Sequence, residues 1–142
     1  MKTTIHQVPL ILMDEMMPHL APHLARGFEH VKMDPAGLAD EIRNDLTQVW
    51  AVFLDKKIVA AFLTSIHAMP DETKTLDIFG LGGEAAPSWG ATLSDVMADF
   101  ARKNGCNRFV FAGRKAWERI CGNVTVIGVR AGDHMSFERI LA

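Results

Sequence analysis

The chain has 142 residues, of which 49% are hydrophobic, and its 15 Lys and Arg against 17 Asp and Glu give a net charge of −2. This length and composition predict a single globular domain over residues 1–142 and exclude a disordered chain. No run of Lys or Arg provides the electrostatic attraction on which non-specific nucleic-acid binding depends, so we expect no nucleic-acid partner.

The sequence also gives an expectation for the compartment. The longest apolar run near the N-terminus, Val8 to Met13, is too short for a signal sequence or a membrane span, and Asp14 and Glu15 follow it. Cys106 and Cys121 lack metal-type spacing and are interpreted as reduced thiols. We therefore expect a soluble, cytoplasmic protein without a membrane partner.

Hydrophobic spacing in the first half of the chain predicts a strand, two helices and a meander of three strands. Pro18 and Pro22 interrupt the first helix, so we expect it to be broken or kinked there. Asp34 followed by Pro35 starts the second helix, whose buried face is expected to extend to Leu46. The elements expected in this half are a strand over 2–6, helices over 10–28 and from 35, and strands over 49–54, 58–67 and 74–80.

The second half of the chain predicts a long amphipathic helix over about 88–103, with Ser88 as N-cap and Asn104-Gly105 as its stop. Apolar residues recur on one face of this helix from Trp89 to Ala101. The remaining elements expected are a strand over 108–112, a short helix over 114–121, and strands over 124–130 and 135–141.

The stretch 76–117 carries the strongest functional signal, because a strand leads through a glycine-containing loop into the long helix. The loop reads Gly80-Leu-Gly-Gly-Glu-Ala85. Backbone N–H groups converge where such a loop enters a helix, and the helix dipole favours bound phosphate. The alternative is that Gly82 and Gly83 only permit a sharp strand exit or a bulge.

The element order β-α-α-β-β-β-α-β-α-β-β resembles the GNAT (Gcn5-related N-acetyltransferase) fold over nearly the whole chain. The resemblance implies an α/β (α+β) class with a central mixed, mostly antiparallel sheet, flanking helices and a β-α-β crossover. More narrowly, residues 81–117 resemble small phage- or prophage-encoded GNAT-like proteins. The residues that carry this narrower resemblance are Leu81, Gly82, Gly83, Trp89, Ala101, Arg102, Gly105, Cys106, Gly113, Arg114 and Trp117.

The GNAT resemblance implies binding of acetyl-CoA or another acyl-CoA, with no metal. The pyrophosphate of the cofactor would lie on the loop before the long helix. The chain departs from the family pattern at Gly80, where Gln or Arg is usual, and at Glu84, whose charge opposes a phosphate, while Pro87 removes a backbone donor. The implied cofactor contacts are Leu81, Gly82, Gly83, Ala85, Ser88, Gly90 and Arg114.

Acyl transfer to an amine needs a base that removes the amine proton, and Asp77 and Glu84 are the candidates. Asp77 alternates with Leu76 and Ile78, which is equally typical of the solvent face of a half-buried strand. The family usually protonates the leaving thiolate with a tyrosine, and this chain has none.

Three further features have both a chemical and a structural interpretation. His19 and His23 have the i, i+4 spacing of a helical metal site, but no third ligand is evident, so surface histidines are favoured and no metal is predicted. His67 either caps the hairpin or lines a substrate cleft. Arg114 either binds a phosphate or carboxylate or anchors the short helix, and Trp117 is expected to pack that helix on the sheet.

Two functions therefore stay open. The missing tyrosine and the acidic loop favour a phage- or prophage-type GNAT-fold protein with weak or lost catalysis, which acts as a structural or binding component among phage structural proteins and is associated with the virion. The alternative is an acyl-CoA-dependent N-acyltransferase that acylates an amine. Exposed edge strands also offer a surface for a homodimer, with the C-terminal strands as the favoured place.

Overall fold

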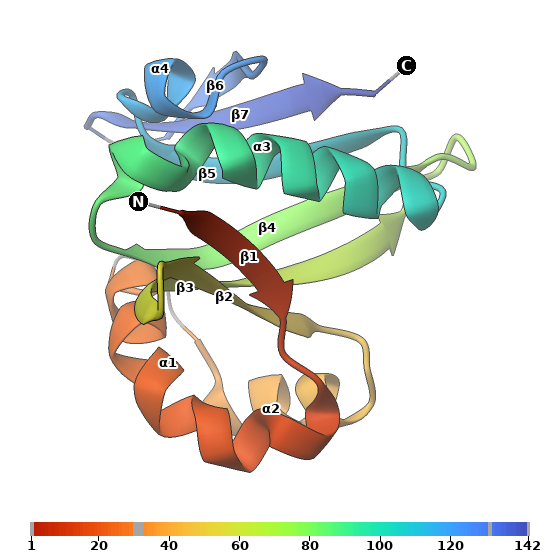
Figure 1. Ribbon diagram of the computed structural model, residues 1–142. Coiled ribbons are helices and arrows are strands. Elements are labelled where there is room, and N and C mark those ends of the chain that lie inside the picture. The colour runs from red at the N-terminus through yellow and green to blue at the C-terminus, as the bar shows by residue number, and fades with distance from the viewer. Residues whose placement is uncertain (1, 30–32, 131, 142) are drawn as a thin grey trace. The chain divides into compact units, whose positions relative to one another are not determined.

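The computed structural model describes residues 2–29, 33–130 and 132–141 and shows a mixture of helices and strands (Figure 1). A 3-10 turn at Leu10–Leu12 precedes the first helix. The elements in chain order are β1 (Thr3–Gln7), α1 (Met13–Gly27), α2 (Pro35–Arg43), β2 (Gln48–Leu54), β3 (Lys57–Ala68), β4 (Lys74–Gly83), α3 (Ala86–Lys103), β5 (Arg108–Arg114), α4 (Trp117–Cys121), β6 (Thr125–Val129) and β7 (His134–Ile140).

The strands follow the hydrogen-bonded order β1-β2-β3-β4-β5-β7-β6. β4 and β5 pair in parallel, from Thr75 opposite Arg108 to Asp77 opposite Val110, and α3 makes the crossover between these two strands. The pairs β1–β2, β2–β3, β5–β7 and β6–β7 are antiparallel. The predicted element order, the mixed sheet and the β-α-β crossover are therefore confirmed.

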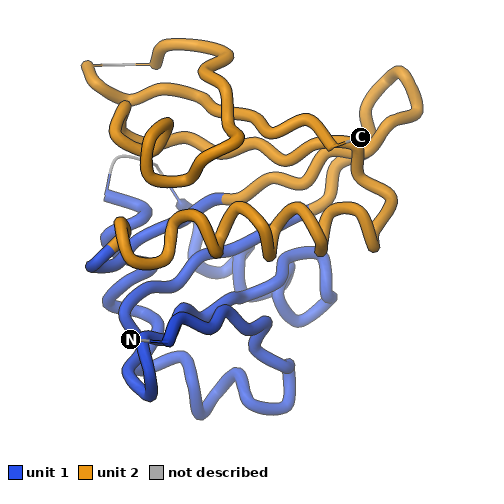
Figure 2. The backbone as a smooth tube through the Cα atoms, turned by 45° about the horizontal axis from the view of Figure 1, so that its top comes forward, with its two compact units in different colours: residues 1–65, 79–85 blue, residues 66–78, 86–142 orange. Residues whose placement is uncertain are grey.

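The chain forms two compact units, shown in different colours in Figure 2. Residues 1–65 and 79–85 form the first unit, and residues 66–78 and 86–142 form the second. The strands β3 and β4 each contribute to both units, so the boundary does not coincide with a linker. The single domain over 1–142 stays a prediction. No helix among the described residues is both long and apolar enough to cross a membrane.

The core of the first unit lies between its two helices and its strands. Apolar residues spaced four apart along α1 form a stripe that faces this core, because Leu20 and Leu24 are buried and Met16 and Phe28 pack beside them. The buried side chains of this core are Val8, Leu20, Leu24, Ile42, Val49, Ala51, Ala61 and Leu63.

Two expectations for these helices need correction. α1 is not broken, because Pro18 and Pro22 lie inside one continuous helix, whereas the expected kink stays a prediction. Both prolines are exposed, so the carbonyl groups that lose their N–H partner can be hydrated. Leu46 is not on a buried face: α2 ends at Arg43, Asp45 takes a left-handed conformation with φ 58°, and Leu46 is 63% exposed.

The C-terminal end of α1 and the end of β4 meet backbone to backbone within the first unit. A Cβ added at Gly27 would lie 2.8 Å from the Leu81 nitrogen and closer still to the Gly80 carbonyl. A Cβ added at Gly82 would lie 2.5 Å from the Gly27 nitrogen. The three glycines therefore let a helix and a strand approach at a distance that no side chain would permit.

The core of the second unit forms where α3 and α4 cover one face of its strands. Trp117 of α4 lies between Trp89 of α3 and Phe111 of β5, with ring centroids 5.5 Å and 6.0 Å away. Phe111 also stacks on Phe137 of β7 at 5.0 Å. The expected packing role of Trp117 is therefore confirmed.

The predicted ends of α3 are right at one terminus only. The helix begins at Ala86, so Ser88 is its third residue and not the N-cap. The two additional residues include Pro87, which fits the first turn because that turn needs no N–H from it. At the other end Gly105 takes a left-handed conformation with φ 76°, as the Asn104-Gly105 stop predicts.

We predict that Gly27→Ala destabilises the protein by about 1–3 kcal/mol, because the added methyl group overpacks the contact with Gly80 and Leu81. Alanine in a helix otherwise adds stability, by roughly 0.5–1 kcal/mol over glycine. Urea denaturation measures the difference. The matched control is Gly128→Ala, where a Cβ meets nothing within 4 Å. Equal stability of the two variants would contradict the proposed contact.

Candidate functional site

The glycine loop has a packing role in the first unit. A Cβ added at Gly83 would lie 2.5 Å from both the Ala60 Cα and the Val59 carbonyl oxygen, and Gly82 lies against the backbone of α1. The Glu84 N–H donates to the Val59 carbonyl at 2.9 Å. The close strand exit considered from the sequence is therefore present. The cofactor contacts expected at Leu81, Gly82 and Gly83 stay predictions, since packing alone accounts for the two glycines.

A shallow groove lies beside this loop, entirely within the first unit. Its lining residues are Leu54, Asp55, Lys56, Lys57, Val59, Glu84 and Ala85. The Lys57 Nζ lies 3.1 Å from the Glu84 Oε1. This hydrogen bond and the lysine charge, with smaller effects of Arg26 and His23, lower the pKa of Glu84. Glu84 is therefore a poor proton acceptor, and its charge is compensated by a lysine that the sequence did not reveal.

The residues of the groove fit a phosphate-bearing cofactor in part. Lys56 and Lys57 supply ammonium groups at its rim, and Ala85 turns the chain directly into α3 with φ 60°. Glu84 competes for Lys57, however, so a phosphate group must displace or share this ion pair. Lys56, Lys57 and Ala85 are the residues that would contact it.

Asp77 lies in the second unit, on β4, and is half-buried between the buried Leu76 and Ile78. Its Oδ2 is 4.0 Å from the Nε2 of His67 on β3, which is too long for a hydrogen bond but close enough for electrostatic attraction. Burial raises the pKa of Asp77 above its usual range, and the nearby His67 and Arg130 oppose that rise. Asp77 thus combines access to solvent with increased basicity, which a general base requires.

The closeness of His67 and Asp77 follows from a signal already present in the sequence. The Met69 N–H donates to the Thr73 carbonyl at 2.8 Å and closes the predicted turn between β3 and β4. Counting outward from this bond in an antiparallel hairpin puts His67 diagonally across from Asp77 on the same face. The turn and the strand alternation could therefore have brought these two residues together before the structure was known.

The other expected cofactor contacts lie in different surroundings. Ser88 is exposed in the first turn of α3, whereas Gly90 is buried and a Cβ there would lie 2.9 Å from the Ile120 carbonyl of α4. Packing of the two helices explains this glycine. Arg114 is exposed at the end of β5, and among the described residues it makes no ion pair. As cofactor contacts, Ser88, Gly90 and Arg114 stay predictions.

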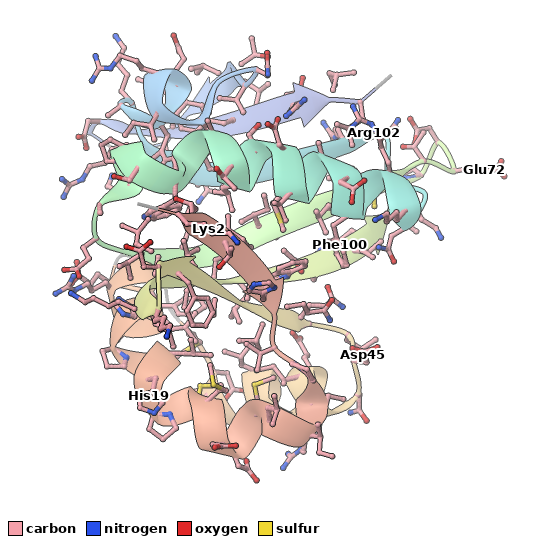
Figure 3. All side chains as sticks on the ribbon, viewed as in Figure 1. Lys2, His19, Asp45, Glu72, Phe100 and Arg102 are labelled. Atoms are coloured by element: carbon pink, nitrogen blue, oxygen red, sulfur yellow. The ribbon has the colours of Figure 1, made fainter. Side chains whose placement is uncertain are left out.

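The cysteines and the histidine pair of α1 form no reactive site. Cys106 and Cys121 are buried, and burial raises the pKa of Cys121 to about 11, which keeps the thiol protonated. His19 projects from the exposed side of α1 (Figure 3), while His23 is half-buried and its Nδ1 has no hydrogen-bond partner within the described residues. No cluster of three or more His, Cys, Asp or Glu in residues 2–29, 33–130 and 132–141 could hold a metal ion.

Solved structures share this fold, although no protein-family model matches the sequence and no curated protein is similar to it. The N-acyl amino acid synthase FeeM from uncultured soil microbes is 8% identical with a TM-score of 0.65, over 99% of this chain and 91% of that chain. The GNAT-family acetyltransferase from Streptococcus pneumoniae is 11% identical with a TM-score of 0.61, over 99% and 100%. The glucosamine-6-phosphate N-acetyltransferase from Arabidopsis thaliana is 12% identical with a TM-score of 0.64, over 93% and 97%.

These similarities confirm the GNAT fold that the element order predicts. At such low identities they show the fold alone. The narrower resemblance to phage- or prophage-encoded proteins gains no support from them.

We predict that Asp77→Asn leaves the protein equally stable or more stable at neutral pH, by at most about 1 kcal/mol, since the side chain is 39% exposed. The folded state raises the pKa of Asp77, so the ionised carboxylate opposes folding above that pKa. As the pH falls to about 3, below the ordinary Asp pKa of about 3.9, the carboxyl is protonated in both the folded and the unfolded state and the difference disappears. Urea denaturation at both pH values tests the sign, and a variant that is less stable at neutral pH would contradict it.

Proposed function

We propose that the protein is an acyl-CoA-dependent N-acyltransferase that transfers an acyl group to a primary amine. The observation that carries this proposal is Asp77, a half-buried carboxylate of raised pKa beside His67 on the strand that leads into the loop before α3. The fold supports the same reaction class, because two structural neighbours, the N-acyl amino acid synthase and the glucosamine-6-phosphate N-acetyltransferase, are named as enzymes that acylate amines.

In the proposed reaction, acyl-CoA supplies the activated thioester. Asp77 removes a proton from the bound ammonium group, and the neutral amine forms the C–N bond as the C–S bond breaks. The nitrogen loses its second proton as the amide forms, and the leaving thiolate takes up a proton to give free CoA. One proton is thus left on Asp77 and one on the thiol, so atoms and charge balance. His67 would hold Asp77 in position and stabilise its ionised form until the proton is transferred.

The non-catalytic alternative rests on the absent tyrosine, on Gly80 in place of the usual Gln or Arg, and on Glu84. The ion pair between Glu84 and Lys57 weakens the last of these three arguments, because the acid no longer presents an uncompensated charge to a phosphate. A role as a phage structural component, with phage proteins as partners, remains the alternative outcome of the experiments below.

We predict acetyl-CoA-dependent acylation of a primary amine, measured as release of free CoA thiol. Asp77→Asn should lower kcat/KM by about 10²–10⁴-fold, the usual contribution of a general base. Its affinity for acetyl-CoA, measured by calorimetry, should stay unchanged. Asp99→Asn is the matched control, because Asp99 is an exposed carboxylate of α3 paired with Lys103. Full activity of Asp77→Asn would exclude this base, and no binding of acetyl-CoA at millimolar concentration would favour the non-catalytic alternative.

The groove gives a separate prediction about the cofactor. Lys57→Ala should weaken CoA binding about 3- to 10-fold through loss of a charged phosphate contact, and Glu84→Gln should strengthen it by releasing Lys57. Calorimetry with CoA measures both changes. S-acetylpantetheine, which lacks the phosphate groups, is the control ligand and should bind all three proteins equally. If the two variants shift CoA affinity in the same direction, the groove does not hold the phosphates.

A further inference from the structure

The second unit has one sheet face that its own helices do not cover. Phe111 contacts Trp117 of α4, and Phe137 stacks on Phe111, so both rings lie on the face that α4 covers. Side chains alternate along a strand, so the neighbours Ala112 and Ser136 point to the opposite face, where they lie directly across from each other. Ala112 is exposed and Ser136 is half-exposed, which agrees with this assignment.

The pairing register orders this open face into rows. Asp77 lies opposite Val110, which lies opposite Glu138 of β7. In the next row towards the β6–β7 turn, Ala112 lies opposite Ser136, and Ser136 lies opposite Gly128. The register of β6 shifts between Val126 and Gly128, which puts the exposed Ile127 beside the end of this row. A strip of three small residues on β5, β7 and β6 therefore lies beside the row that contains the proposed base.

An arginine closes the far side of this strip. The Arg130 N–H donates to the His134 carbonyl at 2.9 Å, and its side chain folds back so that Nε donates to the Ser136 hydroxyl at 3.2 Å. Its guanidinium group is near enough to Asp77 to influence the pKa of that carboxyl. In the part of the chain that the structure describes, Arg130 makes no ion pair.

The other charged side chains next to the strip are either paired with each other or positively charged. Glu138 is paired with Arg108 at 3.0 Å, and Arg108 also donates to Thr75. Arg114 follows Ala112 on the same face and adds a second positive charge at the Arg130 side. The face thus has an available carboxylate on one side of the small-residue strip and guanidinium groups on the other.

We propose that this strip binds the acyl acceptor and selects a small primary amine that also carries an anionic group, a carboxylate or a phosphate. The ammonium group would lie at Asp77 and the anion at Arg130, which can form two parallel hydrogen bonds to either anion. The strands of Asp77 and Ser136 are separated by about 10 Å, and their rows by about 7 Å. Because the side chains of Asp77 and Arg130 both extend over the strip, the distance between their charged groups is shorter than the distance between their strands. A molecule between the sizes of an amino acid and an amino sugar phosphate can therefore reach both groups.

This inference rests on the proposed function, and its test separates the two. Wild-type protein is assayed with acetyl-CoA and four amines: glutamate, glucosamine 6-phosphate, ethanolamine and putrescine. We expect acylation of an anionic amine and weaker acylation of the neutral and cationic amines. The carboxylate and phosphate substrates distinguish the two sources of negative charge.

Arg130→Gln should raise KM for the accepted anionic amine about 10- to 100-fold, the loss expected for a charge-assisted hydrogen bond. The kcat/KM for ethanolamine should change less than about 2-fold. Arg102→Gln is the matched control, because Arg102 is an exposed arginine near the C-terminal end of α3 (Figure 3). Preference for putrescine, or equal effects of Arg130→Gln and Arg102→Gln, would overturn the inference and leave the acyltransferase proposal standing.

A binding measurement tests the inference even if the protein does not catalyse acylation. NMR titration of the protein with glutamate and with glucosamine 6-phosphate, without cofactor, should shift the amide signals of Ala112 and Ser136, and Arg130→Gln should weaken this binding. Binding that depends on Arg130 without any acylation would support the anionic-amine site and refute the acyltransferase. Absence of both binding and acylation would refute both proposals.

Discussion

The contact between the end of α1 and the end of β4 determines how the first unit presents its groove. Gly27 and Gly82 let the backbones of the two elements approach each other, and Gly80 leaves room for the ring of Phe28 beside this contact. This approach fixes the strand exit from Gly83 to Ala85, and therefore the position of Glu84 beside Lys57. A glycine-containing loop that resembles a phosphate cradle in the sequence is thus also a packing element, and the charge of its neighbours governs what it can bind.

The residues that we propose for cofactor binding and those that we propose for catalysis belong to different units. The charged groove formed by Lys56, Lys57 and Glu84 belongs to the first unit, while Asp77, His67 and Arg130 belong to the second. The strand β4 contributes to both, because its first residues lie in the second unit and its last residues in the first. The proposed base and the loop proposed to bind the cofactor are therefore linked covalently by a few residues of one strand.

The sequence predicts the fold well because hydrophobic periodicity is a local property. Residues a few positions apart in the chain are enough to predict the stripe of α1, the Asp34-Pro35 start and the stop at Gly105. The unbroken α1 is not predictable in this way, because whether a proline is tolerated depends on which face meets the solvent. Likewise Asp77 is identified from its strand, but its relation to Arg130 requires the register of four strands, which single-residue patterns do not contain.

The missing tyrosine affects the expected rate of the reaction more than the reaction class. An alkyl thiol has a pKa of about 8.5, so a thiolate leaves readily and can take its proton from water. A dedicated acid typically contributes about 10²–10⁴-fold. The buried Cys121 provides no substitute on this structural evidence, because its thiol lies against the buried Ser94 and is enclosed in the core. The proposed reaction, which has a base in Asp77 and no dedicated acid, is therefore expected to be slow, and its proposed selectivity depends on how well Asp77 and Arg130 orient the amine.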